Sequence, residues 1–356
     1  MQSVSVKQVP TYSPQLLDEA IAAHFDALDV ASDLTPESRV LIKPNLLAGR
    51  APDLAVTTHP EVLLAVVRWL SARGITKITL ADSPGGVYTP ASLRKTYTAC
   101  GLDVLDDFLT LNEDITASNK DGFSIITPVL EADYIINCCK LKTHGLTVMT
   151  AGVKNLFGCV PGLKKPEIHC MKPTIGSFCN LLVDLAEVVR PQVTLLDAID
   201  CMEGNGPGGG SVRHMGYTLA SRSPYALDEQ ATLLMGLQMQ MIPILRIAKE
   251  RKLLSGTTQL LGDTLRPANP PFTLPDAVLG TESIFTPKGI FHIVFGRKKA
   301  FPRVLTRRCV GCGLCAESCP KHIIKIVNKK AVISKKNCIS CFCCQEMCPA
   351  HAIEAK

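Results

Sequence analysis

The sequence predicts an α/β fold with a mostly parallel sheet and helices on both faces, followed by a small C-terminal α+β domain. Before residue 270, short apolar runs alternate with amphipathic segments of helical period, the pattern of parallel strands joined by helices. After residue 300 the chain carries nine of its sixteen cysteines. We therefore expect an α/β domain over residues 1–270, a connecting segment over 271–302 and a cysteine-rich domain over 303–356.

Within the first domain, four apolar runs are predicted as strands, and three helices lie between or beside them. The predicted strands are residues 40–42, 75–81, 134–139 and 193–196. The predicted helices are residues 59–70, 90–100 and 176–189. Thr58 is the expected cap of the first helix, because Glu61 follows three residues later at the capping-box position.

Each predicted strand ends in polar or glycine-rich residues. In chain order these are Lys43 and Asn45; Asp82 and Ser83; Lys140, Lys142 and His144; and Asp200, Glu203, Gly204 and Gly206. Parallel strands present their carboxyl ends at one edge of a sheet, where ligands bind. We therefore expect one mouth that collects these side chains into a candidate active site.

The residue types at this mouth suit an anionic small molecule. Lysines bind carboxylates or phosphates, and glycines let backbone amides approach an anion. The densest stretch holds His144, Lys154, Asn155 and His169. Histidine exchanges protons near neutral pH, and a buried lysine can act as a base or nucleophile. We expect catalytic roles for His144, Lys154, Asp200 and Asp82, and substrate binding by the other mouth residues, Asn155 and His169.

A purely structural interpretation of this mouth stays open. Each histidine could be a satisfied core residue, each lysine a solvated surface residue and Asp82–Ser83 a helix cap. The glycine-rich stretch 203–210 matches neither the dinucleotide-binding fingerprint nor the phosphate-binding loop of nucleotide hydrolases.

The C-terminal cysteines form two complete runs with the spacing C-x2-C-x2-C-x3-C-P. This spacing is typical of bacterial two-cluster ferredoxins, in which the fourth cysteine of each run ligates the other cluster. We therefore predict two [4Fe–4S] clusters in a bacterial ferredoxin-like domain. One cluster is assigned to Cys309, Cys312, Cys315 and Cys348, and the other to Cys338, Cys341, Cys344 and Cys319.

Two alternatives to electron transfer at these runs are a zinc site and a purely structural role for the clusters. Zinc sites typically pair two C-x2-C knuckles, whereas two four-cysteine runs that each end in proline are more specific for clusters. Two neighbouring clusters form a path for electrons, which favours electron transfer. Cys343 is a ninth thiol within the second run, and we assign it to packing.

The charge of +6 is concentrated in the cysteine-rich domain, where residues 303–356 hold ten Lys or Arg and three Asp or Glu. A basic face favours docking of an acidic electron carrier such as ferredoxin or flavodoxin. No nucleic-acid-binding motif, membrane-length apolar run or secretory signal is visible, so we expect a cytoplasmic protein. The Met/Leu pattern of residues 237–254 indicates core packing or, alternatively, a homodimer face.

Several motifs together resemble an uncharacterised family known as domain of unknown function 362, which is often fused to a ferredoxin module. They are Lys43-Pro-Asn, Asp82-Ser-Pro-Gly-Gly, Lys140-x-Lys-Thr-His, Thr150-x3-Lys-Asn-x2-Gly and Asp200-x2-Glu-Gly-Asn-Gly-Pro. The resemblance covers nearly the whole chain and implies an iron–sulfur protein of prokaryotic anaerobic metabolism. It does not imply a particular reaction.

A second resemblance is to the nickel-pincer lactate racemase superfamily. His144, Lys154, Pro161-Gly162 and His169 match the order of a histidine, a cofactor-bearing lysine, Pro-Gly and another histidine in that family. The upstream metal histidine has no counterpart here, because Asp82-Ser83 occupies that region, and the racemase lacks a ferredoxin module. This likeness implies a shared fold.

Three functions follow as hypotheses. The first is an oxidoreductase in which electrons pass through both clusters to an anionic molecule at the mouth. The second is a lyase, isomerase or racemase-like enzyme with an additional, unidentified cofactor in the α/β domain. The third is an electron-transfer or assembly subunit without catalytic activity.

Overall fold

The α/β domain is built on one mixed sheet. The computed structural model describes residues 2–85, 89–162, 164–254, 256–279 and 300–355. The strand order is β11-β1-β10-β9-β7-β2-β3-β4, with β8 paired to β7. Strands β2, β3, β4, β7 and β9 run parallel to one another, and β10 is antiparallel to both of its neighbours. The predicted mostly parallel sheet is confirmed.

The strands of this sheet and the separate β5–β6 hairpin alternate with the helices along the chain. The strands are β1 (Gln2–Gln8), β2 (Val40–Lys43), β3 (Ile78–Leu80), β4 (Thr110–Leu111), β5 (Ala117–Lys120), β6 (Phe123–Ile126), β7 (Tyr134–His144), β8 (Val148–Thr150), β9 (Val193–Glu203), β10 (Ser211–Ser221) and β11 (Thr258–Gly262). The α-helices are α1 (Pro14–Ala27), α2 (Pro60–Ser71), α3 (Pro90–Ala99), α4 (Thr127–Glu131), α5 (Gly152–Asn155), α6 (Lys164–Met171), α7 (Ile175–Val189), α8 (Pro224–Leu234), α9 (Pro243–Glu250) and α10 (Asp276–Leu279). Short 3-10 helices are η1 (Val30–Asp33), η2 (Pro52–Leu54), η3 (Leu102–Leu105), η4 (Leu156–Cys159) and η5 (Met239–Met241).

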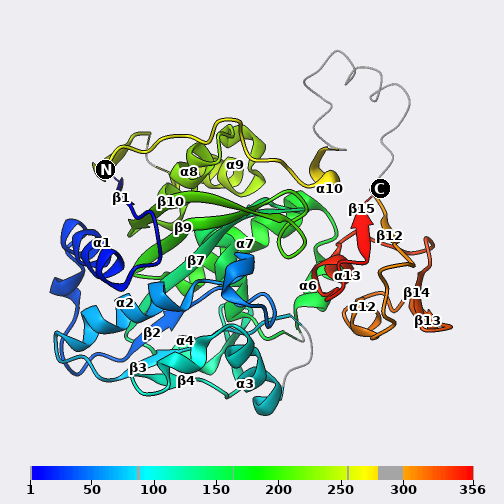
Figure 1. Cartoon of the computed structure of the whole chain (residues 1–356), viewed down its shortest axis with the longest axis horizontal. Coiled ribbons are helices and arrows are strands. Elements are labelled where there is room, and N and C mark those ends of the chain that lie inside the picture. Colours follow the sequence, from blue (N-terminus) through cyan, green and yellow to red (C-terminus); the bar gives the residue numbers. More distant parts are fainter. Residues whose placement is uncertain (1, 86–88, 163, 255, 280–299, 356) are drawn as a thin grey trace.

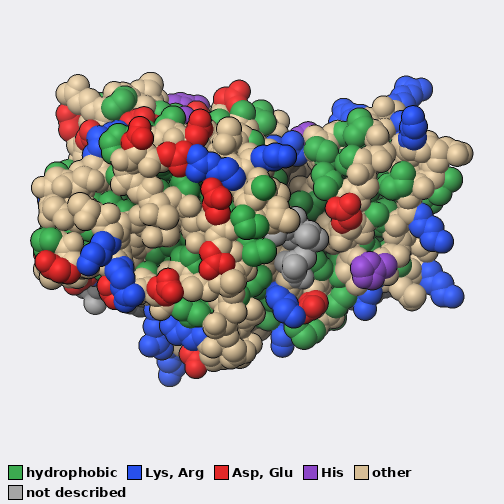
Figure 2. Space-filling view, turned by 90° about the horizontal axis from the view of Figure 1, so that it is seen from below, with side chains coloured by type: hydrophobic (Ala, Val, Ile, Leu, Met, Phe, Trp, Pro, Cys, Tyr) green, Lys and Arg blue, Asp and Glu red, His purple; other side chains and the backbone are tan. Residues whose placement is uncertain are grey.

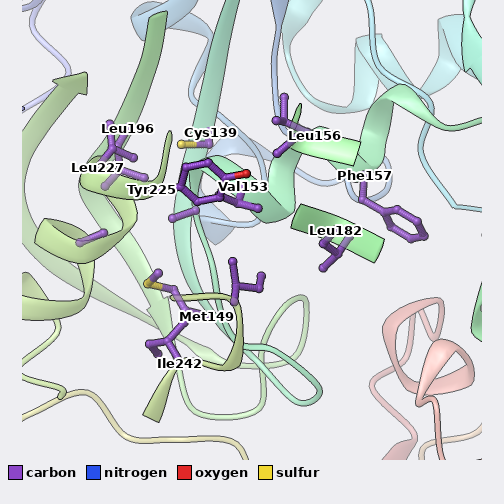
Figure 3. Close-up of a cluster of buried hydrophobic side chains, with 14 of the residues drawn as sticks. Cys139, Met149, Val153, Leu156, Phe157, Leu182, Leu196, Tyr225, Leu227 and Ile242 are labelled. Atoms are coloured by element: carbon purple, nitrogen blue, oxygen red, sulfur yellow. The ribbon is translucent and has the colours of Figure 1, made fainter. Parts of the chain in front are cut away.

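Apolar residues on the two faces of the sheet form two cores. In β2, Val40 and Ile42 face the core that contains α1, α2 and α3, whereas Leu41 faces the core that contains α7, α8 and α9. This alternation follows from the two-residue period of a strand. Figure 1 shows the helices above and below the sheet, and Figure 3 shows part of the second core, where Val153 of α5 lies near Tyr225. The predicted helices on both faces are confirmed.

Two strands run further than their apolar pattern predicted, and one is shorter. β7 continues through His144 and β9 through Glu203, so the polar residues that were expected in loops lie on strands. β3 covers only Ile78–Leu80 of the expected residues 75–81. Longer strands carry their polar side chains away from the sheet centre, toward the C-terminal domain.

The expected cap of α2 was wrong. His59 is the N-cap residue, and its Nδ1 accepts a hydrogen bond from the backbone N–H of Glu61. The Thr58 hydroxyl instead donates to the carbonyl of Cys138 and accepts from the N–H of Asn45. Thr58 therefore ties the loop after β2 to β7, which helps to shape the edge where the mouth was predicted.

The C-terminal module, residues 300–355, packs at one end of the α/β domain. Its elements are β12 (Pro302–Val304), α12 (Leu314–Glu317), β13 (Ile324–Val327), β14 (Lys330–Ile333), α13 (Cys343–Glu346) and β15 (Ile353–Ala355). β12 pairs with β15 and β13 with β14, both antiparallel. Figure 1 shows the module in orange and red, beside α6 and α10. Of the expected connecting segment, residues 280–299 lie outside the described residues.

Residues 237–254 pack into the second core. Ile244, Leu245 and Ala248 of α9 are buried there, and Met239 and Met241 are partly buried against the same core. The structure thus places this segment where core packing was expected, and a homodimer stays a prediction. Among the described helices, none has the length and apolar character needed to cross a membrane.

Candidate active site between the two domains

A pocket lies where the module meets the carboxyl ends of β2, β3 and β7. Its cavity is small, about 90 Å³. The α/β domain contributes most of the predicted site residues to its lining: Asn45, Asp82, Ser83, Lys142, His144, Lys154, Asn155 and His169. The module contributes Ser318, Cys343, Glu346 and Met347. The expected meeting of strand ends therefore holds for β2, β3 and β7, and the pocket is shared by two domains.

Asp82 is fixed at the base of this pocket by a buried ion pair. Its Oδ1 lies 3.1 Å from Nζ of Lys43, and its Oδ2 accepts a hydrogen bond of 2.8 Å from the N–H of Leu46. Lys43 Nζ also donates to the carbonyl of Pro44. A Cβ at Gly158 would overlap both charged groups, so only glycine fits there. Lys43 therefore neutralises Asp82 from beneath and does not itself line the pocket.

His144 presents an N–H to the module. Its Nδ1 accepts a hydrogen bond of 3.0 Å from the N–H of Leu146, which places the imidazole hydrogen on Nε2. Nε2 lies 3.2 Å from Oε1 of Glu346, the last residue of α13. Burial lowers the pKa of His144, although the charge of Glu346 opposes that shift. His144 is thus positioned as a neutral hydrogen-bond donor at neutral pH.

Three lysine side chains line the same pocket. Burial and the charge of Lys154 lower the pKa of Lys142 to about 7. Burial also lowers the pKa of Lys165 to about 8, and it lowers the pKa of Lys154. Lys142 donates to the carbonyl of Val56 and Lys165 to that of Ser83. Lys154 Nζ lies 5.1 Å from the ring centre of Phe157. Because these amines repel one another, an anion in the pocket would be stabilised.

A chain of amides and hydroxyls completes the wall. Asn155 accepts a hydrogen bond of 2.7 Å from Asn45 and donates one of 2.8 Å to Asn137. Within the described residues, Asn45 Oδ1 and Thr150 Oγ1 are buried and have no hydrogen-bond partner. Unpaired buried polar atoms are unfavourable, so both atoms are available to a ligand.

The turn that carries Lys154 and Asn155 is held by a carboxylate from α8. Asp228 accepts hydrogen bonds from the N–H groups of Gly152 and Val153, at 2.6 and 3.1 Å. Burial raises the pKa of Asp228 to about 7, although these two hydrogen bonds oppose the shift. Asp228 therefore helps to fix where Lys154 enters the pocket.

Several predicted site residues lie elsewhere. Lys140 is buried below the pocket and pairs with Asp197 at 2.8 Å, because the two residues are register partners on β7 and β9. Asp200 pairs with His214 of β10 at 2.7 Å, away from the pocket lining. Glu203 pairs with Arg213 at 2.8 Å. These three assignments to the site are corrected, since each side chain contacts a neighbour on an adjacent strand and does not line the pocket.

The glycines at positions 204 and 206 support the pocket wall without lining it. The carbonyl of Gly204 accepts a hydrogen bond of 2.8 Å from the Thr143 hydroxyl. A Cβ at Gly206 would overlap the carbonyl of Thr143, which explains the small residue there. Pro207, the next residue, lines the pocket. The expected ligand contacts of Gly204 and Gly206 are therefore replaced by packing on β7.

The two cysteine runs surround two separate cavities in the module. We call Cys309–Cys319 the outer run and Cys338–Cys348 the inner run. One cavity is lined by Cys309, Cys312, Cys315 and Cys348, and the other by Cys319, Cys338, Cys341 and Cys344. These are the two sets that the spacing predicted. All sixteen cysteines, each within the described residues, are free thiols, and such sets of four thiols fit four-iron clusters.

The inner run adjoins the pocket. Cys343 does not line either cluster cavity and instead lines the pocket, so its assignment to packing is corrected. Phe342 packs against Ala277 of α10. Across the same interface, Arg50 donates to the carbonyl of Cys348 and Cys170 to that of Pro320. Sequence reasoning missed Glu346, Cys343 and Met347 because spacing alone does not indicate which side of a run docks.

The fold and the thiol sets define an iron–sulfur protein with an α/β domain. The chain belongs to the family described as domain of unknown function (DUF362), whose model matches residues 40–232. A 4Fe-4S dicluster domain model matches residues 301–349. The predicted family and the 4Fe-4S ferredoxin-like module are both confirmed.

Two known proteins are similar to this chain. The thylakoid-associated protein sll1697 of Synechocystis sp. is 34% identical over 258 residues, which cover 70% of this chain and 79% of that protein. The lactate racemase apoprotein of Thermoanaerobacterium thermosaccharolyticum superposes with a TM-score of 0.40 at 11% identity. That superposition covers 64% of this chain and 55%, about half, of the racemase chain.

Proposed function

We propose that the protein is an oxidoreductase that passes electrons through two [4Fe–4S] clusters to an anionic small molecule in the pocket between the domains. One observation carries the proposal: Cys343, Glu346 and Met347 of the inner run line the same pocket as three lysines of the α/β domain. Electrons held on the inner run would therefore have a ligand site directly beside them.

The cluster ligands in this proposal are the two sets of thiols that surround the module cavities. Cys309, Cys312, Cys315 and Cys348 would hold the outer cluster, and Cys319, Cys338, Cys341 and Cys344 the inner cluster. Backbone N–H groups of Ala331, Ser340 and Ala352 point to the sulfurs of Cys309, Cys338 and Cys348. Such hydrogen bonds tune the reduction potential of a bound cluster.

The chain's own residues would bind the ligand and stabilise its charge. Lys142, Lys154 and Lys165 stabilise its negative charge in a site with little water. Nε2 of His144 carries a hydrogen that points toward Glu346 at the pocket, so His144 is the neutral hydrogen-bond donor that we propose for the ligand. Asp82, neutralised by Lys43, orders the backbone of Leu46 at the pocket wall.

Electrons would enter from an acidic carrier such as ferredoxin or flavodoxin. Cys312 is exposed, and Val310 beside it is 66% exposed, so the outer run is open to a partner. Figure 2 shows Lys and Arg side chains spread around the module end of the molecule. Opposite charges speed the encounter of electron-transfer partners, and the rate falls as salt screens them.

Anaerobic turnover tests the proposal. The holoprotein, supplied with a reduced acidic carrier, should consume one member of a panel of small carboxylates and phosphates. Lys154→Gln should abolish that activity, whereas Lys164→Gln should retain it, because Lys164 is exposed. Equal activity of both variants would exclude the pocket as the site, and absence of turnover with every compound would favour an assembly or carrier role.

The second candidate is a lyase or isomerase with a further cofactor in the α/β domain. His144, Lys154 and His169, which carry the resemblance to the racemase superfamily, line one pocket. Among the described residues, no three His, Cys, Asp or Glu side chains are grouped as ligands of a single metal ion. Metal analysis after anaerobic purification separates the candidates: about eight iron atoms per chain without nickel supports the oxidoreductase.

A further inference from the structure

Equivalent glutamates of the two cysteine runs occupy opposite environments. Glu317 ends α12, two residues after Cys315, and Glu346 ends α13, two residues after Cys344. Glu317 is exposed to solvent. The side chain of Glu346 is only 17% exposed, and its Oε1 lies 3.2 Å from Nε2 of His144. The inner run thus sends a carboxylate into the α/β domain, and the outer run does not.

The side chains around the Glu346 carboxylate form a binding site for an anion. His144, Lys154 and His169 each act on Glu346 electrostatically, and Lys142 lies within the range of its charge. Burying a carboxylate is unfavourable unless positive or hydrogen-bonding groups compensate for the lost water. Nε2 of His144 supplies a hydrogen-bond donor at 3.2 Å, and the amines of Lys154 and Lys142 supply positive charge. This anion-binding site therefore suits a carboxylate, and the side chain of Glu346 occupies it.

The rest of the pocket has binding capacity that Glu346 does not use. Thr150 Oγ1 is unpartnered among the described residues, and Thr150 is only 3% exposed. Asn45 Oδ1 at the same wall is also buried and unpartnered there. However, the cavity that remains is only about 90 Å³. A ligand that also accepts a hydrogen bond from Nε2 of His144 must take the place of the Glu346 carboxylate, whose Oε1 lies 3.2 Å from that nitrogen.

We propose that Glu346 is the built-in occupant of a carboxylate subsite, and that the ligand of this pocket carries a carboxylate group that takes its place beside His144. This inference rests on the proposed function, because it concerns the same pocket. Exchanging the Glu346 carboxylate for the ligand carboxylate replaces one negative charge by another, so the net charge of the site is preserved. It also frees the helical turn between Cys344 and Cys348, so the chain that holds both runs responds to ligand arrival.

Formate binding to the anaerobically prepared holoprotein tests the proposal. Titration calorimetry would compare wild type, Glu346→Ala and the matched control Glu317→Ala. Removing the internal competitor frees a charge-assisted hydrogen bond, so formate should bind Glu346→Ala at least about tenfold more tightly than wild type. Glu317→Ala should bind formate as wild type does, and neutral formamide should not bind Glu346→Ala measurably.

Iron content and the cluster absorbance would show whether the alanine variant keeps its clusters. If it does not, Glu346→Ser removes the same carboxylate together with most of its volume and carries the same expectation. Equal formate affinity in wild type and both Glu346 variants would overturn the proposal, as would formamide binding as tight as formate binding. The binding experiment contains no reductant, so equal formate affinities would overturn the carboxylate subsite but would not bear on electron delivery. Conversely, tighter formate binding to Glu346→Ala together with no turnover of any compound would reject the proposed oxidoreductase function and leave the subsite standing.

Discussion

The two cysteine runs share one spacing but face different surroundings. In the outer run, Leu314 is 38% exposed. Its counterpart in the inner run is Cys343, which lines the pocket. The runs differ least at the positions that hold a cluster and most at the positions between them. A repeat that needs only its cysteines for cluster binding can therefore use its other side chains for separate tasks, docking outside and ligand contact inside.

The backbone of the runs shows the same division. Gly311 and Gly313 of the outer run have positive φ angles of 70° and 91°. Ser340 and Phe342 hold the equivalent positions with φ of 54° and 60°. A left-handed conformation is unfavourable for residues other than glycine. In the inner run Phe342 adopts this unfavourable conformation. The Phe342 ring packs against Ala277, which helps to attach the run to the α/β domain.

Removing one cluster ligand from each run should produce the largest difference between them. Cys341→Ala should abolish reoxidation of the reduced protein by its pocket ligand, because three of the four cysteines proposed for the inner cluster belong to the run that lines the pocket. Cys312→Ala should retain reoxidation after chemical reduction but should lose reduction by an acidic carrier. Stopped-flow absorbance of anaerobic protein would measure both rates. Identical defects in the two variants would break the distinction between an outer and an inner cluster.

Exchanging the residues at the left-handed positions should give a smaller and asymmetric change in stability. Gly311→Ala should lower the free energy of unfolding by at least about 1–2 kcal/mol, because of its positive φ and because its Cβ would overlap the carbonyl of Lys329. Ser340→Gly should change it by less than about 1 kcal/mol, because it relieves strain at the cost of chain entropy. Thermal unfolding under anaerobic conditions would compare them, and equal destabilisation would contradict this account.

The amines that line the pocket beside the inner run should make ligand binding sensitive to pH. Burial lowers the pKa of Lys142 to about 7 and that of Lys165 to about 8. Their positive charge is present below these values and is lost as the pH rises through them. Formate affinity of Glu346→Ala should therefore fall severalfold between pH 6 and pH 9. In this background Lys142→Met should flatten the profile, whereas Lys164→Met should leave it unchanged. A flat profile of Glu346→Ala itself would argue against charged amines.

Three of the four strand ends that the sequence predicted lie at the pocket. Lys142 and His144 were found because polar residues at the ends of apolar runs mark the carboxyl edge of a parallel sheet. Lys154 was found because it lies in the dense stretch with two histidines. Lys140 was assigned wrongly for a physical reason. It lies two residues before Lys142, roughly 7 Å back along the strand, where the β7–β9 register places it beside Asp197. Strand register depends on tertiary packing and cannot be obtained from strand patterns alone.

The module's share of the site could not be predicted from spacing. The cysteine pattern determines how a run folds around a cluster, but not which side of the run meets another domain. Glu346 and Cys343 acquire their roles only through docking against β7 and α6. The available signal was the difference between the repeats, because Leu314 in one run corresponds to Cys343 in the other. Comparing repeat positions that are not ligands would have identified the inner run.

The most direct test of the central claim is whether electrons pass from the clusters to a ligand in the pocket. Protein reduced anaerobically with dithionite would be mixed with the carboxylate or phosphate that the turnover panel identifies as the pocket ligand, with and without saturating formate, and cluster absorbance would be followed. We predict that formate, bound beside His144, blocks reoxidation and leaves reduction by dithionite unchanged. Reoxidation at the same rate under saturating formate would show that electrons leave by another route and would contradict the account.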